Sequence, residues 1–392
     1  MIFDSESVFE ENVITVLKQH GWKDGVLRYP TERDLLDNWK DILYRNNNDI
    51  DRLGKYPLTD GEMAQIIEQI ETLRTPLALN SFVNGRTVSI TRDNKEDVAH
   101  FGKEVSLYIY DRKEIAGGKS TYQIAQQPVY PAKNKMLNSR RGDLVLLING
   151  MPLIHIELKK SGIPVSQATN QIEKYAHEGV FTGLFRLVQI FVAMNPDDAV
   201  YFANPGVDKF NPSYYFHWAD YNNEPICGGQ NPGKDEWKLF IGGTSGTAGL
   251  LSIPMAHQLI GFYTIADSAD GCLKVLRSYQ YIAANAISDV VRKCDWEQRP
   301  SMPGRPGGYV WHTTGSGKTM TSFKSAQLIA DSHDADKVVF LMDRIELGTQ
   351  SLKEYRSFAD SETEVQGTEN TGVLRDKLNS TDVNDTLIVT SI

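Results

Sequence analysis

Cysteine is scarce in this sequence. Three residues occur among 392, far apart and at a spacing that fits neither a disulfide framework nor a zinc site: Cys227, Cys272 and Cys294. This usage is typical of a reducing cytosolic compartment. Long apolar runs are also missing, because Arg186 and Gln189 interrupt the most apolar window, 180–194, and the acidic N-terminus does not resemble a signal peptide. We therefore expect a cytoplasmic protein without a membrane span.

An excess of positive charge is absent as well. Lys and Arg total 41 against 50 Asp and Glu, which gives a net charge of −9. This balance argues against a protein that coats nucleic acid through its overall charge. It leaves room for a local basic groove, for which the candidates are Lys133, Lys135, Arg140, Arg141, Lys159 and Lys160. A solvated loop explains the same cluster equally well.

The length predicts two or three domains. Residues 5–20 carry apolar side chains at helical spacing, residues 80–160 contain strand-like runs, and residues 166–177 are typical of a helix. The apolar run 253–266 is also helical in pattern and is expected to close the first domain. We therefore predict an α/β domain over 1–262.

The remaining residues, 263–392, follow a different rhythm. Residues 309–311 (YVW) predict a short strand, 320–332 a helix, and 337–343 and 385–392 two buried strands. Strand, helix and strand in this order indicate parallel βαβ units. The second domain is therefore predicted to be a parallel α/β domain.

The segment HTTGSGKT, residues 312–319, joins the expected strand to the expected helix. This is the context that a phosphate-binding loop requires. Gly315 and Gly317 let backbone N–H groups turn toward a phosphate, and the helix start adds partial positive charge. Lys318 is expected to reach the β- and γ-phosphates, and Thr319 to bind Mg²⁺. The general pattern begins with glycine, whereas this segment begins with histidine; a flexible glycine-rich loop is the alternative.

The strand-like segment MPLIHIELKK, residues 151–160, places Glu157 and Lys159 on one face, because residues two apart in a strand point the same way. Asp143 begins the preceding strand. Two carboxylates with backbone carbonyls form an oxygen-only site suited to Mg²⁺. Lys159 beside them would orient or deprotonate a water and offset negative charge on a phosphodiester. An edge strand with a salt-bridged glutamate is the alternative.

The hairpin register tests this interpretation. A two-residue turn at Asn149-Gly150 would put Asp143 opposite Ile156, on the face away from Glu157. A three-residue loop or one bulge would put Asp143 on the same face as Glu157. The metal interpretation therefore predicts an irregular loop around 148–151, and a two-residue turn without a bulge would count against it.

Two further candidates lie on predicted helices. Gln171 and Tyr175 are four residues apart and share a helix face, from which both could reach a phosphate or brace the lysine. An ordinary amphipathic face is the alternative. Glu10, on the first helix, is a candidate for the outer shell of the metal.

Taken together, these segments resemble the restriction and motor (R) subunit of type I restriction endonucleases. The resemblance extends from about Ser5 to the last residue, and its order and relative spacing are similar throughout. It rests on DLVLLINGMPLIHIELKK, NQIEKY, YFAN, LRSYQYIAANAI, GGYVWHTTGSGKTMTSFKSA, LMDRIELGTQ and TLIVTSI. The histidine that opens the phosphate loop is also typical of this family.

The resemblance implies a restriction-endonuclease-like mixed sheet flanked by helices, with a PD-(D/E)xK nuclease site, followed by a partial RecA-like parallel α/β motor domain of superfamily 2. In the nuclease site, Asp143 and Glu157 would hold Mg²⁺, and Gln171 and Tyr175 match the family's glutamine–tyrosine motif. Gln280 matches the adenine-reading position, since an amide both donates and accepts. The ATP site then comprises Gln280, Thr314, Gly315, Ser316, Gly317, Lys318 and Thr319, and Asp343 and Arg344 match a further motor motif.

The implied activity is Mg²⁺-dependent cleavage of double-stranded DNA coupled to ATP-driven translocation, in a complex with methyltransferase and specificity subunits. The acidic motif that activates the hydrolytic water and a second RecA-like domain are expected after TLIVTSI, where this sequence ends. We therefore expect this chain alone to be a poor motor. Two other interpretations remain: a non-catalytic fragment that docks on DNA or partner subunits, and a stand-alone Mg²⁺ nuclease whose motor part only binds nucleotide.

Overall fold

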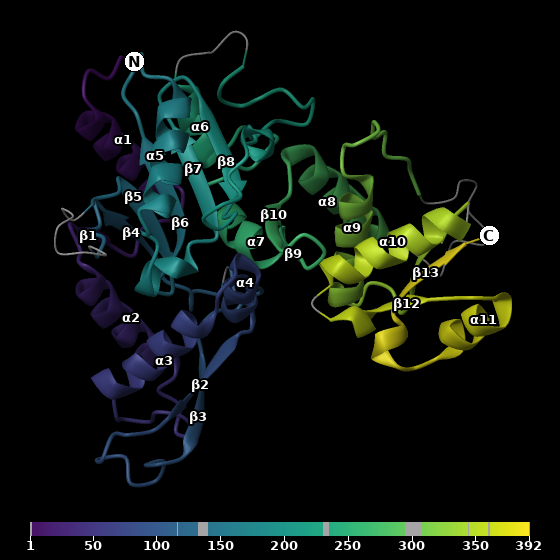
Figure 1. The fold of residues 1–392 in the computed structure, drawn as a ribbon, viewed down its shortest axis with the longest axis horizontal. Coiled ribbons are helices and arrows are strands. Elements are labelled where there is room, and N and C mark those ends of the chain that lie inside the picture. Colours follow the sequence, from purple (N-terminus) through teal and green to yellow (C-terminus); the bar gives the residue numbers. More distant parts are fainter. Residues whose placement is uncertain are drawn as a thin grey trace. The chain divides into compact units, whose positions relative to one another are not determined.

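The computed structural model describes residues 2–115, 117–131, 140–229, 235–294, 307–343, 345–359 and 361–391. These residues form two compact units (Figure 1). Unit 1 comprises Met1–Thr264 and Leu273–Val275, and unit 2 comprises Ile265–Cys272 and Leu276–Ile392. A two-stranded ribbon contributes to both units and consists of β9 (Thr264–Asp267) and β10 (Cys272–Val275).

Unit 1 is built on a six-stranded mixed sheet in the order β1-β4-β5-β6-β7-β8. The pairs β1–β4 and β6–β7 are parallel, and the other three are antiparallel. The strands are β1 (Val26–Arg28), β4 (Tyr122–Gln126), β5 (Leu144–Ile148), β6 (Met151–Leu158), β7 (Ile190–Met194) and β8 (Ala199–Ala203). All residues of β4 to β8 are buried, as expected for a sheet that is covered on both faces.

Helices cover this sheet (Figure 1). On α5, Ala168 and Ile172 lie one helical turn apart and pack with Phe191 and Phe202 of the neighbouring strands β7 and β8. The helices of the sheet region are α1 (Glu6–Gln19), α2 (Glu32–Asn46), α5 (Val165–His177), α6 (Glu236–Gly242) and α7 (Met255–Gly261), with 3-10 turns at Gly183–Leu187 and Pro212–Tyr214. This arrangement confirms the predicted mixed α/β fold class.

The N-terminal helix α1 is fixed by local signals and by aromatic packing. Ser5 caps it by accepting a hydrogen bond from the Val8 N–H, and its apolar face buries Phe9. The Phe9 ring packs edge-on against Trp237 of α6, with 5.2 Å between the ring centroids. This packing fixes the helix that carries Glu10.

A smaller lobe of unit 1 consists of α3 (Asp60–Thr72), α4 (Pro76–Asn84) and the antiparallel ribbon β2 (Thr87–Thr91) and β3 (Glu104–Tyr108). Both strands alternate between exposed and buried residues, which is the pattern of a ribbon covered on one face. Arg92, at the end of β2, is fully buried and donates to Glu62 and Asp97, with 3.0 Å between its Nε and Asp97 Oδ2. It also donates to the carbonyl oxygens of Tyr56 and Pro57.

We expect Arg92→Met to lower the free energy of unfolding of unit 1 by about 3 kcal/mol, because it leaves two buried carboxylates without their cation. Arg33→Met is the matched control: the Arg33 side chain is 60% exposed and pairs with Asp37 and Asp60 at the surface, so its loss should lower the free energy of unfolding much less than Arg92→Met does. Urea unfolding followed by tryptophan fluorescence measures both. Equal effects of the two substitutions would contradict the prediction.

Unit 2 contains a three-stranded parallel sheet in the order β11-β13-β12. Its strands are β11 (Val338–Met342), β12 (Val365–Gly367) and β13 (Leu387–Ser391). Its helices are α8 (Ser278–Lys293), α9 (Lys318–Ser332), α10 (Ile345–Phe358) and α11 (Thr371–Asn379), with 3-10 turns at Glu362–Glu364 and Val383–Asp385. Phe323, Tyr355 and Val389 form the centre of its core.

Several predicted elements differ from the structure. Residues 309–311 form no strand, and Tyr309 and Trp311 are 90% and 87% exposed, because no strand among the described residues pairs with them. The strand β11 was expected to be buried, yet as an edge strand it leaves Val339 and Leu341 exposed. Residues 253–266 were expected to form one helix, but the run contains helix α7 and then the start of strand β9. The apolar run alone did not show where the helix ends.

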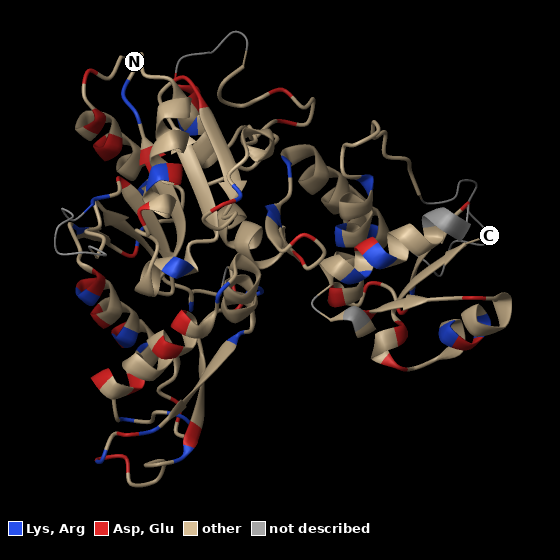
Figure 2. Ribbon diagram, viewed as in Figure 1, with Lys and Arg blue, Asp and Glu red and all other residues tan. Residues whose placement is uncertain are grey.

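The surface helices reflect the negative net charge of the chain. Lys and Arg are interspersed with Asp and Glu along α2, whereas α3 carries acidic residues and neither Lys nor Arg (Figure 2). Across the described ranges, no helix is both long enough and apolar enough to cross a lipid bilayer.

Candidate functional site

The hairpin between β5 and β6 decides where Asp143 lies. Its turn has two residues, Asn149 (φ 52°) and Gly150 (φ 84°), so the predicted irregular loop is not found. The register shifts inside the strands instead: Leu147 pairs with Pro152 and Leu146 with Ile154, which leaves Leu153 as an extra residue on β6. This bulge is the alternative that puts Asp143 on the face of Glu157.

Asp143 and Glu157 lie side by side at the end of this hairpin. Leu144 pairs with Ile156, so Asp143, the residue before Leu144, lies opposite Glu157. The Asp143 Oδ2 accepts a hydrogen bond of 2.7 Å from the Leu158 N–H. Burial raises the pKa of the Asp143 carboxyl well above its usual range, and the adjacent Glu157 raises it further. Burial likewise raises the pKa of Glu157 to about 8, although Lys159 opposes this rise.

Lys159 continues the same face of β6. Its Nζ lies 3.7 Å from Oε1 of Glu157 and 3.7 Å from Oε1 of Glu6, and donates to the Leu158 carbonyl at 2.9 Å. The residue is only 7% exposed. The ammonium group is therefore held beside the carboxylate.

Glu10 approaches from α1 and is buried. Gln126 Nε2 donates to its Oε1 at 2.5 Å, and Gln127 Nε2 lies 3.3 Å from both of its oxygens. Burial raises the pKa of Glu10, the hydrogen bond from Gln126 opposes this, and the Asp143 carboxylate raises it. Glu10 thus lies within electrostatic range of Asp143, while two amides occupy its oxygens.

Gln171 and Tyr175 do share a face of α5. Gln171 Nε2 donates to the Tyr175 hydroxyl at 2.7 Å, and that hydroxyl donates to the Arg141 carbonyl oxygen at 2.9 Å. The pair therefore braces the backbone two residues before Asp143. This geometry makes them positioning residues for the loop that carries Asp143.

The predicted basic groove is only partly described. Lys133 and Lys135 lie outside the described residues. Arg140 makes a two-pronged ion pair with Glu178, at 2.9 Å for both hydrogen bonds. Arg141 and Lys160 are exposed at the edge of the site.

The donor set fits a divalent cation. Both carboxylate oxygens of Glu157 are buried and accept no hydrogen bond from the described residues, and a buried unpaired carboxylate is costly. Within the described ranges, no group of three or more His, Cys, Asp and Glu side chains is arranged to hold a metal ion. The candidate ligands are therefore two carboxylates supplemented by backbone carbonyl oxygens, the hard ligands that Mg²⁺ prefers.

The sequence interpretation missed His155. This residue is fully buried two positions before Glu157, and its Nε2 lies 3.3 Å from Oε2 of that carboxylate. The alternation of the strand already placed it on the face of Glu157, but burial and partners were not visible in the local pattern. Burial lowers the pKa of His155 to about 4, so the ring is neutral near pH 7.

The phosphate-type loop lies in unit 2. Gly315 (φ 76°) and Gly317 (φ 82°) adopt left-handed conformations, and α9 begins at Lys318. Lys318 Nζ donates to the Thr313 carbonyl oxygen at 3.1 Å, and the Ser316 hydroxyl donates to the same oxygen at 2.7 Å. The loop thus forms before helix α9 although the strand predicted in front of it does not.

Gln280, at the start of α8, is buried against this loop. Its Oε1 accepts from the Arg277 N–H at 3.0 Å, and its Nε2 donates to the Gly317 carbonyl oxygen at 3.3 Å. Both ends of the amide are therefore engaged with backbone groups. For Gln280 to bind adenine, these two hydrogen bonds would have to be exchanged for new ones.

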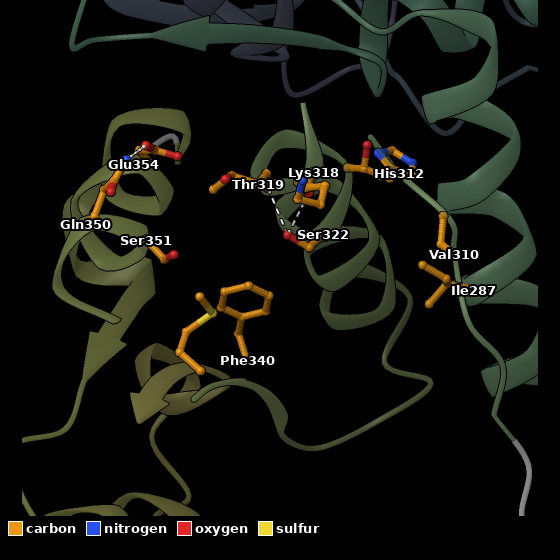
Figure 3. A pocket seen from close by; sticks show the side chains of 12 residues that line it. Ile287, Val310, His312, Lys318, Thr319, Ser322, Phe340, Gln350, Ser351 and Glu354 are labelled. Atoms are coloured by element: carbon orange, nitrogen blue, oxygen red, sulfur yellow. Dashed lines mark hydrogen bonds between the residues drawn. The ribbon is translucent and has the colours of Figure 1, made fainter. Parts of the chain in front are cut away.

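A pocket of about 500 Å³ adjoins the loop. Lys318 and Thr319 line one side of it and Phe340 of β11 lines another (Figure 3). Met342 of the same strand also lines the pocket. Thr314, Gly315, Ser316, Gly317 and Gln280 do not line it. Of the further predicted motor motif, Asp343 is exposed directly after β11, and Arg344 lies outside the described residues.

Two known protein families match this chain. The family described as type I restriction enzyme R protein N terminus matches residues 4–210, which is more than half of the chain. The chain belongs to this family. A second family, the SWI2/SNF2 ATPases, matches residues 279–392 and so covers the phosphate-type loop. Both matches confirm the resemblance drawn from the sequence motifs.

Individual relatives agree. The chain is 31% identical over 400 residues to a type I restriction enzyme endonuclease subunit from Staphylococcus saprophyticus, and 32% identical over 394 residues to one from Staphylococcus aureus. Each alignment covers 100% of this chain and 37% of the relative, so the chain spans little more than a third of their length. The EcoprrI endonuclease subunit from Escherichia coli is 28% identical over 343 residues, covering 80% of this chain and 99% of that subunit.

Proposed function

We propose that this chain carries the DNA-cleaving site and part of the ATP-dependent motor of the restriction subunit of a type I restriction–modification system. The activity is hydrolysis of a phosphodiester in double-stranded DNA, dependent on Mg²⁺ and coupled in the whole enzyme to ATP-driven translocation. The observation that carries the proposal is the convergence of Asp143, Glu157 and Lys159, with Nζ of Lys159 3.7 Å from Oε1 of Glu157.

The proposed chemistry assigns one task to each of these side chains. Asp143 and Glu157 would hold Mg²⁺, which when bound supplies charge stabilisation at the phosphate and a more acidic water. Lys159 offsets the negative charge that develops on the phosphate oxygens and orients the attacking water. Tyr175 and Gln171 keep Arg141 and the following Asp143 in place, and Glu10 belongs to the outer shell.

For unit 2 we propose ATP binding at the loop 312–319. Lys318 contacts the phosphates, Thr319 binds Mg²⁺, and the backbone of Thr314 to Gly317 wraps the phosphate chain. Gln280 reads adenine after releasing Gly317. ATP hydrolysis and translocation require two motor lobes that close on the nucleotide, and we assign both activities to the whole enzyme. The partners are DNA and the methyltransferase and specificity subunits, and the location is cytoplasmic.

The test is nicking of supercoiled plasmid by the 392-residue chain. We expect relaxed circles with Mg²⁺ and none with EDTA, because both carboxylates require the cation to act. Asp143→Asn, purified in parallel, keeps the shape of the side chain and controls for contaminating nucleases. Nicking that survives EDTA or the Asp143→Asn substitution would refute the proposed site, and absence of nicking with retained binding to the partner subunits would favour a docking role.

A further inference from the structure

His155 forms a buried polar pair with Tyr130 underneath the proposed metal ligands. The Tyr130 hydroxyl lies 2.8 Å from His155 Nδ1, and both residues are at most 1% exposed. On the opposite edge of the ring, Nε2 lies 3.3 Å from Oε2 of Glu157, and neither of these two buried atoms has a hydrogen-bond partner within the described ranges. The imidazole thus lies between a phenol, to which it is hydrogen-bonded, and a carboxylate that its second nitrogen faces.

Aromatic rings hold the imidazole in this place. The rings of Tyr175, Phe181 and Phe191 surround it, with centroids at 6.4, 5.5 and 6.0 Å. Both of its nitrogens face polar groups of the protein: Nδ1 faces the Tyr130 hydroxyl and Nε2 faces the Glu157 carboxylate. A histidine that served only to fill space would be replaceable by an apolar side chain of similar volume.

The donor and acceptor inventory selects one tautomer. Within the described part of the chain, the only hydrogen bond of the Tyr130 hydroxyl joins it to Nδ1 of His155. We assign the phenol as the donor and Nδ1 as the acceptor, because the buried O–H has no other acceptor among the described residues, whereas either ring nitrogen of a neutral imidazole can accept. The proton of the imidazole is then on Nε2, on the edge that faces Oε2 of Glu157.

Gly142 makes room for this pair. A Cβ atom at Gly142 would lie 2.5 Å from the Tyr130 hydroxyl oxygen and 2.8 Å from His155 Cε1, closer than side chains tolerate. Gly142 immediately precedes Asp143. The backbone next to Asp143, one proposed ligand, therefore packs directly against Tyr130 and His155, and His155 lies beside Glu157, the other proposed ligand.

We propose that Tyr130 and His155 form a positioning pair, in which Tyr130 fixes the imidazole tautomer and the Nε2–H of His155 orients the Glu157 carboxylate toward a divalent cation. The proposal deepens the function proposed above and rests on it. His155 acts through Glu157 and does not touch the substrate. Polar groups behind ligating carboxylates are a known determinant of metal affinity, and their replacement typically costs 10–100-fold.

The test measures Mn²⁺ binding to the 392-residue chain by calorimetry, without DNA. His155→Leu removes the donor, and we expect the affinity for Mn²⁺ to fall at least about tenfold. His155→Gln keeps an N–H near the position of Nε2, and its affinity should stay within about threefold of the unsubstituted chain. A space-filling role predicts the reverse order, because leucine suits an apolar pocket better than glutamine.

Two further variants test the geometry. Tyr130→Phe removes the hydroxyl that fixes the tautomer and should weaken Mn²⁺ binding, by less than His155→Leu does. Gly142→Ala pushes on both rings and should weaken binding like His155→Leu. Gly246→Ala is its control, since a Cβ there meets nothing within 4 Å. Equal Mn²⁺ affinity in Gly142→Ala and Gly246→Ala would contradict the proposal.

If His155→Leu fails to fold, the unsubstituted chain decides the question. Its ¹⁵N-histidine NMR spectrum with saturating Mg²⁺, where Glu157 is a carboxylate, should show the neutral Nε2–H tautomer, with the His155 signals assigned through His155→Gln. An Nδ1–H tautomer would overturn the proposal. Failure of the two proposals is distinguishable. If the unsubstituted chain does not bind Mn²⁺, both the proposed nuclease site and the positioning pair are refuted. If it binds Mn²⁺ and His155→Leu binds it equally well, only the positioning pair is refuted.

Discussion

Lys159→Met is expected to lower the rate of Mg²⁺-dependent DNA cleavage about 10³-fold. The ammonium group lies 3.7 Å from Glu157 and is held by the Leu158 carbonyl oxygen at 2.9 Å. It is the lysine that pairs with Glu157, and removing one such group from a water-excluded site typically costs 10²–10³ in rate. Methionine keeps most of the side-chain volume, so the loss would reflect charge and hydrogen bonding.

Lys160→Met is the matched control. Lys160 is the next residue and is exposed, and its ammonium group donates to the Asp4 carbonyl oxygen at 3.4 Å. Its replacement should change the single-turnover rate by no more than about twofold, with a small effect on the salt dependence of DNA binding. DNA affinity in Ca²⁺ should be similar for both variants. Similar cleavage rates in Lys159→Met and Lys160→Met would exclude Lys159 from the proposed chemistry.

Glu157→Gln is expected to stabilise unit 1 in the absence of divalent metal. Burial raises the folded-state pKa of Glu157 to about 8 from an ordinary value of 4.5. The folded state therefore binds the proton more tightly than the unfolded state, and its stability falls as the pH rises from 4.5 to 8. Above pH 8 the penalty approaches roughly 5 kcal/mol, and glutamine removes it because it carries no charge.

The measurement is urea unfolding of both proteins at several pH values. Four buried tryptophans, Trp22, Trp39, Trp218 and Trp237, lie in unit 1 and report its unfolding by fluorescence. The difference between Glu157→Gln and the unsubstituted chain should be small near pH 4.5 and grow up to pH 8. Mg²⁺ should narrow it, since the cation stabilises only the carboxylate form.

Glu11→Gln provides the contrasting control. Glu11 is 49% exposed, and its hydrogen bonds from Arg28 and Gln126 lower the pKa of its carboxyl. Removing that carboxylate should cost less than about 1 kcal/mol at neutral pH, in the opposite direction. A Glu157→Gln variant that is less stable than the unsubstituted chain at pH 8 would contradict the assigned burial of the charge.

Much of the proposed nuclease site could be predicted because its signals are local. The alternation of β6 placed Glu157 and Lys159 on one face, and a spacing of four residues paired Gln171 with Tyr175 on α5. The glycines of the loop and the helix after it were equally local. The strand predicted at 309–311 failed because a strand exists only through its partner, and no described strand pairs with it.

The sequence by itself determined which side chains share a face within one element, the start of α9 at the phosphate-type loop, and the family to which the chain belongs. Only the tertiary structure decided that Asp143 joins Glu157, through an extra residue at Leu153 inside β6 rather than through the turn. It alone brought Tyr130 to His155, 25 residues away along the chain. The physical reason is that periodicity is set by the backbone of a single element, whereas register and buried pairs depend on the contacts between elements.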